Sequence, residues 1–180
     1  MSKNHTYLRE KADIRNAETP QQIEQARRLF REYEQRLGID LGFQNFEMEL
    51  ASLPGKYDRR EGGRLLLAYA PGEKEAVGCV ALRKVAADVC EMKRLYVRAD
   101  FRCLGVGREL IERVIDEARA EGYQKMMLDT IADKMKTAVG LYQFYGFREI
   151  NPDGADSYPG MIFMEKMLSS PSSPAVSGEI

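Results

Sequence analysis

The sequence contains a single histidine and only three cysteines among its 180 residues, which argues against several kinds of site. His5 stands close to the N-terminus, so a catalytic triad that uses histidine is not expected. Cys79, Cys90 and Cys103 form no C-x-x-C pair, which argues against a redox dithiol and a structural zinc site. The odd number of cysteines and the lack of a signal-peptide pattern predict a reducing, cytoplasmic location.

The sequence also lacks an excess of charge: Lys and Arg number 27, Asp and Glu number 28, and the formal net charge is −1. Proteins that bind nucleic acid or acidic membranes are usually far more basic, so we expect neither partner. No apolar run approaches the roughly 20 residues that span a bilayer. The length and the 44% apolar share predict one domain over residues 1–168. Residues 169–180, rich in serine and proline, are predicted to be a disordered tail.

Hydrophobic periodicity predicts an α-helical N-terminal part, then an antiparallel meander of strands, then alternating helices and strands. Thr19 and Pro20 together are a helix-start signal, and Gly38 is a helix-stop signal. The remaining elements follow from the spacing of apolar residues and from the positions of Gly and Pro. We expect strands over 12–15, 64–70, 76–85, 87–97, 125–130, 147–150 and 161–168, further helices over 43–53, 106–121 and 133–145, and loops over 56–63 and 151–160.

The most informative segment is 95–110, LYVRADFRCLGVGREL, in which a basic loop with two glycines joins a strand to an amphipathic helix. The N–H groups of a helix's first turn have no internal partner, and the helix dipole adds partial positive charge there. Gly105 and Gly107 carry no side chains, so a phosphate could approach these groups closely. A dinucleotide fingerprint would need glycine at Leu110, and a P-loop would need Gly-Lys-Ser/Thr. The segment therefore predicts a phosphate site of another kind.

The pattern Arg102-x-x-Gly105-x-Gly107 closely resembles the signature of the GCN5-related N-acetyltransferase (GNAT) family, which grips the pyrophosphate of acetyl-CoA. The resemblance covers about residues 65–168 and includes Leu-Tyr-x-x-x-Gly-Phe, which ends at Phe147. It implies an α+β fold: a mixed, mostly antiparallel central sheet, splayed at the cofactor site, with helices on both faces. The alternative is a glycine-softened turn whose arginines lie in solvent.

The resemblance also implies where acetyl-CoA, as co-substrate, would bind, and it implies no metal. The strand before the motif would offer backbone groups to the pantetheine. Many family members contact CoA through an asparagine where this chain has Met135, so the resemblance does not carry that contact over, although Met135 could still pack on the cofactor. The cofactor-binding residues implied are Leu95, Tyr96 and Val97 on the strand and Arg102, Cys103, Leu104, Gly105, Val106, Gly107 and Arg108 in the loop.

Acetyl transfer to an amine needs a base for the nitrogen's proton and an acid for the departing thiolate. Glu91 is the candidate base, because many GNAT enzymes carry a glutamate at this position; the alternative is a strand glutamate paired with Arg94 or Lys93. Tyr142 is the candidate acid, because it matches the family's tyrosine; the alternative is a core aromatic. Strict alternation would place Glu91, Lys93, Leu95 and Val97 on one face of the strand, opposite Cys90, Met92, Arg94 and Tyr96.

These observations together predict an acetyl-CoA-dependent N-acetyltransferase in which a primary amine of a small molecule, amino acid or peptide attacks directly. A non-catalytic acyl-CoA-binding sensor or interaction module is the alternative, and a third possibility is a hydroxyl acceptor or a longer acyl chain. Homodimerisation through a sheet edge is left open. Candidates for contact with the acceptor are Tyr33, Phe43, Phe46, Glu47, Asp129, Tyr158 and Met161.

Overall fold

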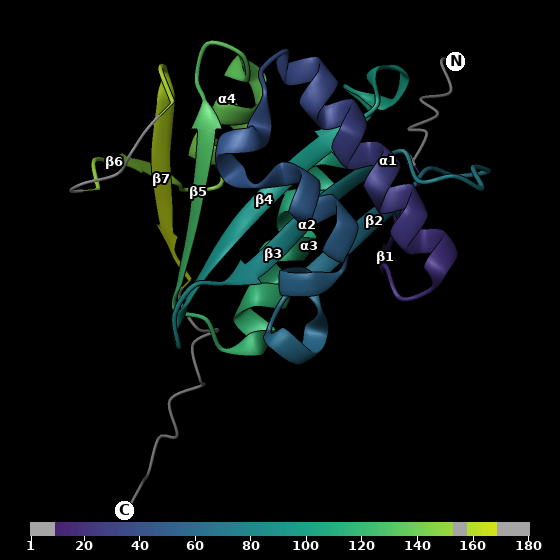
Figure 1. The fold of residues 1–180 in the computed structure, drawn as a ribbon, viewed down its shortest axis with the longest axis horizontal. Helices are drawn as coiled ribbons and strands as arrows, with labels where there is room; N and C mark the ends of the chain where they lie inside the picture. Colours follow the sequence, from purple (N-terminus) through teal and green to yellow (C-terminus); the bar gives the residue numbers. More distant parts are fainter. Residues whose placement is uncertain (1–9, 153–157, 169–180) are drawn as a thin grey trace, which may run out of the picture.

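The computed structural model describes residues 10–152 and 158–168, which form one seven-stranded sheet with helices on both faces (Figure 1). The strand order is β1-β2-β3-β4-β5-β7-β6, and all neighbours pair antiparallel except β4 and β5. The strands are β1 (Asp13–Asn16), β2 (Arg64–Tyr69), β3 (Gly78–Lys84), β4 (Val89–Val97), β5 (Lys125–Ile131), β6 (Arg148–Ile150) and β7 (Met161–Met167). The helices are α1 (Pro20–Leu37), α2 (Phe46–Ser52), α3 (Val106–Glu121) and α4 (Lys136–Phe144). The expected mixed, mostly antiparallel sheet is confirmed. The predicted tail, 169–180, lies outside the described residues.

The sheet is buried on both faces, which explains the continuous apolar run in β2. Leu65 and Leu67 pack beneath α1 and α2, whereas Leu66 points to the side of α3 and α4. Each fully buried leucine contributes about 1.5–3 kcal/mol through the hydrophobic effect. α1 begins with a capping box at Thr19 and ends at Gly38, as its sequence signals predict. Among the described residues, no helix has the length and apolar character needed to cross a membrane.

The helix expected over 43–53 is interrupted. Asn45 has a φ of 55°, and it separates a 3₁₀ turn (Leu41–Gln44) from α2. Asparagine tolerates this left-handed conformation better than most residues, so one residue ends the turn and precedes the helix. The helix expected over 133–145 is also shorter, because Met135 is not helical and α4 begins only at Lys136. Because the first of these segments breaks at Asn45, the 3₁₀ turn is separate from α2 and reaches toward β5.

β4 contains a β-bulge, which overturns part of the expected alternation. Cys79 pairs with Tyr96, but Ala81 pairs with Lys93, so β4 has one residue more than β3 in this stretch. Arg94 is at the bulge with a φ of 59°. The prediction that Leu95 and Val97 share a face with Glu91 and Lys93 is therefore wrong. Lys93, Arg94 and Tyr96 all face α1 and α2, whereas Leu95 and Val97 pack with Cys90 and Met92 on the α3 side.

β4 and β5 pair over only a short stretch and then separate. Their parallel ladder joins Val89–Glu91 to Lys125–Met127. Beyond it, β4 continues beside β3 as far as Val97, and β5 continues beside β7 as far as Ile131. The two strands diverge visibly in Figure 1. This splayed region presents backbone groups that neither strand uses to pair with the other, as the resemblance led us to expect.

Candidate functional site

The glycine loop leads directly into the uncapped N-terminus of α3. Gly105 has a φ of 77° and precedes α3 at its N-cap position, where no side chain of the described residues caps the helix. The first-turn N–H groups are therefore available to an anion. A Cβ on Gly107 would lie 3.8 Å from the Val97 side chain, an ordinary contact. The protein itself therefore does not require glycine at position 107, but the missing side chain leaves room for an anion beside the N–H groups.

A groove of about 690 Å³ runs from this loop along the end of β4 to the start of α4. Five of its sixteen lining residues are basic and only one is acidic, so it suits a polyanion. Its apolar part, which includes Leu95, Ala138 and Leu141, suits the less polar pantetheine arm of CoA. The full lining is Arg36, Leu95, Tyr96, Val97, Arg102, Cys103, Gly105, Gly107, Arg108, Asp133, Lys134, Met135, Lys136, Thr137, Ala138 and Leu141. These residues fit acetyl-CoA.

Arg102 is tethered to the end of β4. Its Nε donates a hydrogen bond of 2.8 Å to the Val97 carbonyl, and its guanidinium lies 5.7 Å from the centre of the Tyr96 ring. Arg108, in the first turn of α3, lies over the Phe144 ring at 5.1 Å. Both arginines are thereby held at the groove rather than free in solvent.

Eight of the ten predicted cofactor residues line the groove. The other two do not: Leu104 is 45% exposed outside it, and Val106 is buried in the core. Three cations of the lining were not expected from the sequence: Arg36, Lys134 and Lys136. The two lysines flank Met135 immediately before a helix, which is a local signal for a second basic patch. Arg36 comes from α1, and no local pattern indicates its position.

A small inner cavity of about 20 Å³, enough for one water molecule, lies at the splay. Tyr142 lines it and is 5% exposed, with its ring edge-on to Phe147 at 5.9 Å. The Tyr142 hydroxyl makes no hydrogen bond to any residue that the structure describes. Burial raises the pKa of Tyr142 well above its usual value, so the hydroxyl keeps its proton at neutral pH.

Glu91 lies at the base of the splay, in the last parallel pair with Met127. Its carboxylate accepts a 2.5 Å hydrogen bond from Arg83 and lies 3.6 Å from the Lys93 ammonium. It lines neither the groove nor the inner cavity. The pairing with Lys93 is one of the alternatives that the sequence offers, and Glu91 as a base stays a prediction.

A hydrogen-bonded network of charged and polar side chains runs from the inner cavity to α2. Asp129 accepts hydrogen bonds from Lys93 at 2.7 Å and from Gln44 at 2.8 Å. Gln44 in turn accepts one from Arg94 at 2.9 Å, and Arg94 pairs with both carboxylate oxygens of Glu49, each at 2.9 Å. No sequence pattern links Glu49 to Arg94, because 45 residues separate them and only the bulge turns Arg94 toward α2.

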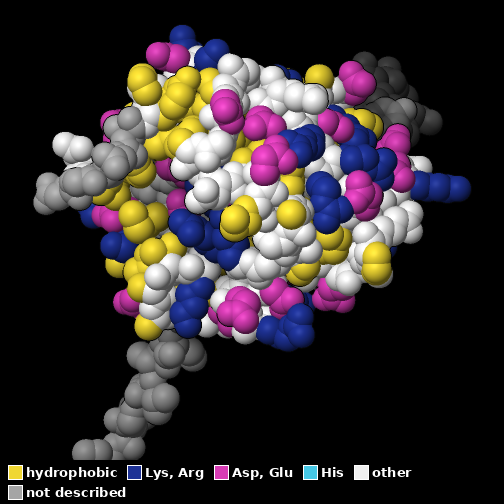
Figure 2. Space-filling view, viewed as in Figure 1, with side chains coloured by type: hydrophobic (Ala, Val, Ile, Leu, Met, Phe, Trp, Pro, Cys, Tyr) yellow, Lys and Arg dark blue, Asp and Glu magenta, His cyan; other side chains and the backbone are white. Residues whose placement is uncertain are grey.

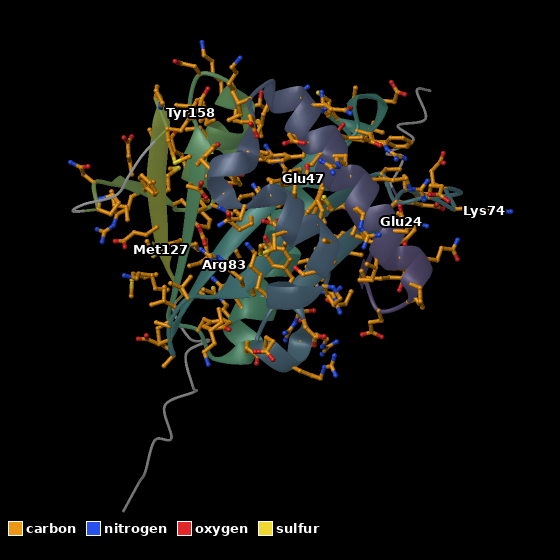
Figure 3. The ribbon with its side chains drawn as sticks, viewed as in Figure 1. Glu24, Glu47, Lys74, Arg83, Met127 and Tyr158 are labelled. Carbon is orange, nitrogen blue, oxygen red and sulfur yellow. The ribbon has the colours of Figure 1, made fainter. Side chains whose placement is uncertain are left out.

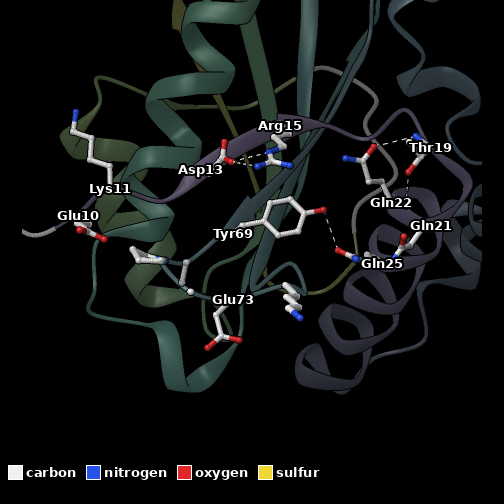
Figure 4. Close-up of a pocket in the computed structure, with 14 residues that line it drawn as sticks. Glu10, Lys11, Asp13, Arg15, Thr19, Gln21, Gln22, Gln25, Tyr69 and Glu73 are labelled. Atoms are coloured by element: carbon white, nitrogen blue, oxygen red, sulfur yellow. Dashed lines mark hydrogen bonds and ion pairs between the residues drawn. The ribbon is translucent and has the colours of Figure 1, made fainter.

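A second hollow, of about 560 Å³, lies at the β1 edge of the sheet (Figure 4). It is lined by β1, the start of α1 and the turn after β2. Arg15 pairs there with Asp13, and the Tyr69 hydroxyl donates a hydrogen bond of 3.0 Å to Gln25. It shares no residue with the groove.

Comparisons with known proteins agree with this geometry. Residues 22–147 match the model of the acetyltransferase (GNAT) family. The chain is 36% identical over 151 residues to an uncharacterized N-acetyltransferase of Schizosaccharomyces pombe, covering 83% of this chain and 91% of that protein.

Solved structures share the fold. An acetyltransferase of the GNAT family from Staphylococcus aureus has a TM-score of 0.73 and 22% identity, covering 88% of this chain and 99% of that one. YncA from Salmonella typhimurium, solved with its cofactor acetyl-CoA, has a TM-score of 0.63 and 19% identity, covering 93% and 99%. The family match and the curated relative together extend over most of the chain. The chain therefore belongs to the GNAT family and is an N-acetyltransferase.

Proposed function

We propose that this enzyme transfers the acetyl group of acetyl-CoA directly to a primary amine, with the thioester placed at the splay between β4 and β5. The observation that supports this most is continuity: Leu95 and Met135 line both the basic groove and the inner cavity. A ligand held by its pyrophosphate at the loop could therefore extend its thioester end to Tyr142.

The ten predicted cofactor residues would bind acetyl-CoA from two elements, the glycine loop with the start of α3 and the end of β4. The N–H groups of Gly105, Val106, Gly107 and Arg108, together with the Arg102 side chain, would hold the pyrophosphate. The part of β4 that pairs with β3 but not with β5, Leu95–Val97, would hydrogen-bond the pantetheine amides. Leu104 and Val106 would take part through their backbone only, since their side chains lie outside the groove.

In the transfer, the amine nitrogen forms a bond to the thioester carbon while the carbon–sulfur bond breaks. Tyr142 donates its hydroxyl proton to the departing sulfur, a role that suits a phenol kept neutral by burial. The amine loses a proton, which Glu91 would accept through water, because the carboxylate lies outside the cavity and is shared by Arg83 and Lys93.

Replacing Arg102 tests the phosphate site. Arg102→Ala is expected to weaken acetyl-CoA binding about 10- to 100-fold, because a charged hydrogen-bond partner contributes roughly 1.5–3 kcal/mol. Calorimetric titration measures the affinity. Arg28→Ala, which removes an exposed α1 arginine paired with Glu75, is the matched control and should bind normally.

The same titration separates the proposed function from its alternative. Wild-type protein that fails to bind acetyl-CoA would contradict the proposal. Wild-type protein that binds acetyl-CoA, but releases no free thiol with any amine in a broad panel, would instead favour the non-catalytic sensor.

A further inference from the structure

We infer that Asp129 binds the amino group of the acceptor, and that the acceptor is a hydrophobic primary amine without a neighbouring carboxylate. This inference rests on the proposed function and specifies its acceptor. It is carried by Asp129, by the pairing of the two cations beside it, and by an aromatic pair close by.

Asp129 lies where an acceptor nitrogen must arrive. It is on the separated half of β5, two residues beyond Met127, the last partner of β4. Its side chain is 11% exposed and lines the inner cavity together with Tyr142. An amine bound there would be close to the thioester that the groove delivers to the same cavity.

Asp129 also has the charge and the free valences to bind an amine. Burial alone would raise the pKa of this carboxyl, but the charge of Lys93 and hydrogen bonds from Lys93 and Gln44 lower it below its usual value. The group is therefore a carboxylate at neutral pH. One oxygen accepts a hydrogen bond from Lys93 and the other accepts one from Gln44. Two carboxylate oxygens offer about four acceptor positions, so capacity remains for the N–H groups of a substrate.

The two cations of the inner cavity are already engaged. Lys93 pairs with Asp129 and Glu91, and Arg94 pairs with Glu49 in a bidentate arrangement. Among the residues that line the inner cavity, no further cation is present. An α-amino acid would bring its own carboxylate next to Asp129, with no lining cation left to compensate it. Two carboxylates held next to each other repel strongly in a partly buried site.

An aromatic pair offers a surface for the rest of the acceptor. Phe43 and Tyr158 stack with their ring centres 5.5 Å apart, and they are 50% and 37% exposed. Phe43 directly precedes Gln44, whose amide binds Asp129. Figure 3 shows Tyr158 near one end of the β5–β7 pair and Met127 farther down the sheet. Asp129 follows Met127 on β5 and pairs with Phe163 of β7. Hydrophobic side chains also gather over this side of the molecule, whereas charges of both signs cover α1 (Figure 2).

Three matched acceptors test the inference with the wild-type enzyme and acetyl-CoA. Phenylethylamine, phenylalanine and phenylalanine amide share one apolar group, and only phenylalanine carries a carboxylate. We expect kcat/KM for phenylethylamine to exceed that for phenylalanine at least tenfold, and the amide to recover most of the difference. Ethylamine, which lacks the ring, should have a KM at least tenfold higher than phenylethylamine.

Two substitutions assign the effect to residues. Asp129→Asn should raise the KM for phenylethylamine at least tenfold while the Kd for acetyl-CoA stays unchanged, which also verifies folding. Phe43→Ala should raise the KM for phenylethylamine but not for ethylamine. Asp116→Asn, on the exposed face of α3, is the control.

The outcomes distinguish the two proposals. If the wild type does not bind acetyl-CoA, the proposed function itself is contradicted. If the wild type binds acetyl-CoA but acetylates phenylalanine as well as phenylethylamine, or acetylates none of the four amines, the inference is overturned while the cofactor site stands. If Asp129→Asn fails to bind acetyl-CoA, its KM cannot be interpreted, and the comparison of the four amines with the wild type decides whether the inference holds.

Discussion

Glu49→Gln is expected to lower the free energy of unfolding by about 3–5 kcal/mol at neutral pH. The Glu49 side chain is 3% exposed and its partner Arg94 is 2% exposed, so the substitution leaves a buried guanidinium without a counter-charge. The Tyr57 hydroxyl, which donates a 2.8 Å hydrogen bond to Glu49, loses a charged acceptor as well. Urea denaturation followed by circular dichroism measures the change.

The pH dependence gives this prediction a second signature. Burial alone would raise the pKa of Glu49, but the hydrogen bonds and charge of Arg94 lower it to about 2 from a reference of 4.5. A carboxyl whose pKa is lower in the folded state stabilises the fold above its unfolded pKa, and this contribution disappears as the pH falls through the folded pKa. It amounts to about 3 kcal/mol. The stability gap between wild type and Glu49→Gln should therefore narrow between pH 4.5 and pH 2.

The matched control lies two residues away on the same helix. Glu47 is 72% exposed and pairs with Arg31 at the surface. Glu47→Gln should leave the free energy of unfolding within experimental error, because solvent screens exposed pairs. If Glu49→Gln were as mild as Glu47→Gln, or if its effect did not depend on pH below 4.5, the buried pair of Glu49 and Arg94 would not stabilise the fold as we expect.

Tyr142→Phe is expected to reduce kcat about 100-fold while the Kd for acetyl-CoA stays unchanged. The substitution removes one oxygen from a buried ring that packs edge-on against Phe147, so the packing is retained. What is lost is the proton for the departing thiolate. Thiol release with a good amine acceptor measures kcat, and calorimetry measures the affinity.

Tyr145→Phe is the control for Tyr142→Phe, because both residues belong to the same segment. The Tyr145 hydroxyl donates a 2.7 Å hydrogen bond to Glu112 on α3. Removing it should leave kcat unchanged. An unchanged kcat for Tyr142→Phe would show that another group, or solvent, protonates the thiolate.

The features that could be predicted from the sequence are those encoded by neighbouring residues. Thr19 and Gly38 bound α1 because a cap needs only its own turn. Gly105 and Gly107 mark the phosphate loop because glycine removes side chains where an anion must approach. Apolar spacing located α3 and most of the strands for the same local reason.

The features that could not be predicted depend on contacts between distant segments. Arg94 adopts a positive φ although arginine has no preference for it, and its pairing with Glu49 on α2 accompanies this conformation. Asn45 interrupts a segment whose composition favours one helix. Arg36 reaches the groove only because α1 packs on the sheet. In each case the determining partner lies outside any local pattern.

The bulge at Arg94 divides β4 into two halves of opposite parity. Before it, even-numbered side chains, Cys90 and Met92, enter the core beneath α3; after it, odd-numbered ones, Leu95 and Val97, do so. The alternation of inward and outward side chains in β4 therefore shifts by one residue at Arg94. Deleting a single residue there would restore one parity and exchange the inward and outward side chains of 95–97. A change in the length of this strand would therefore alter which side chains face the core and the groove even if every residue type were kept.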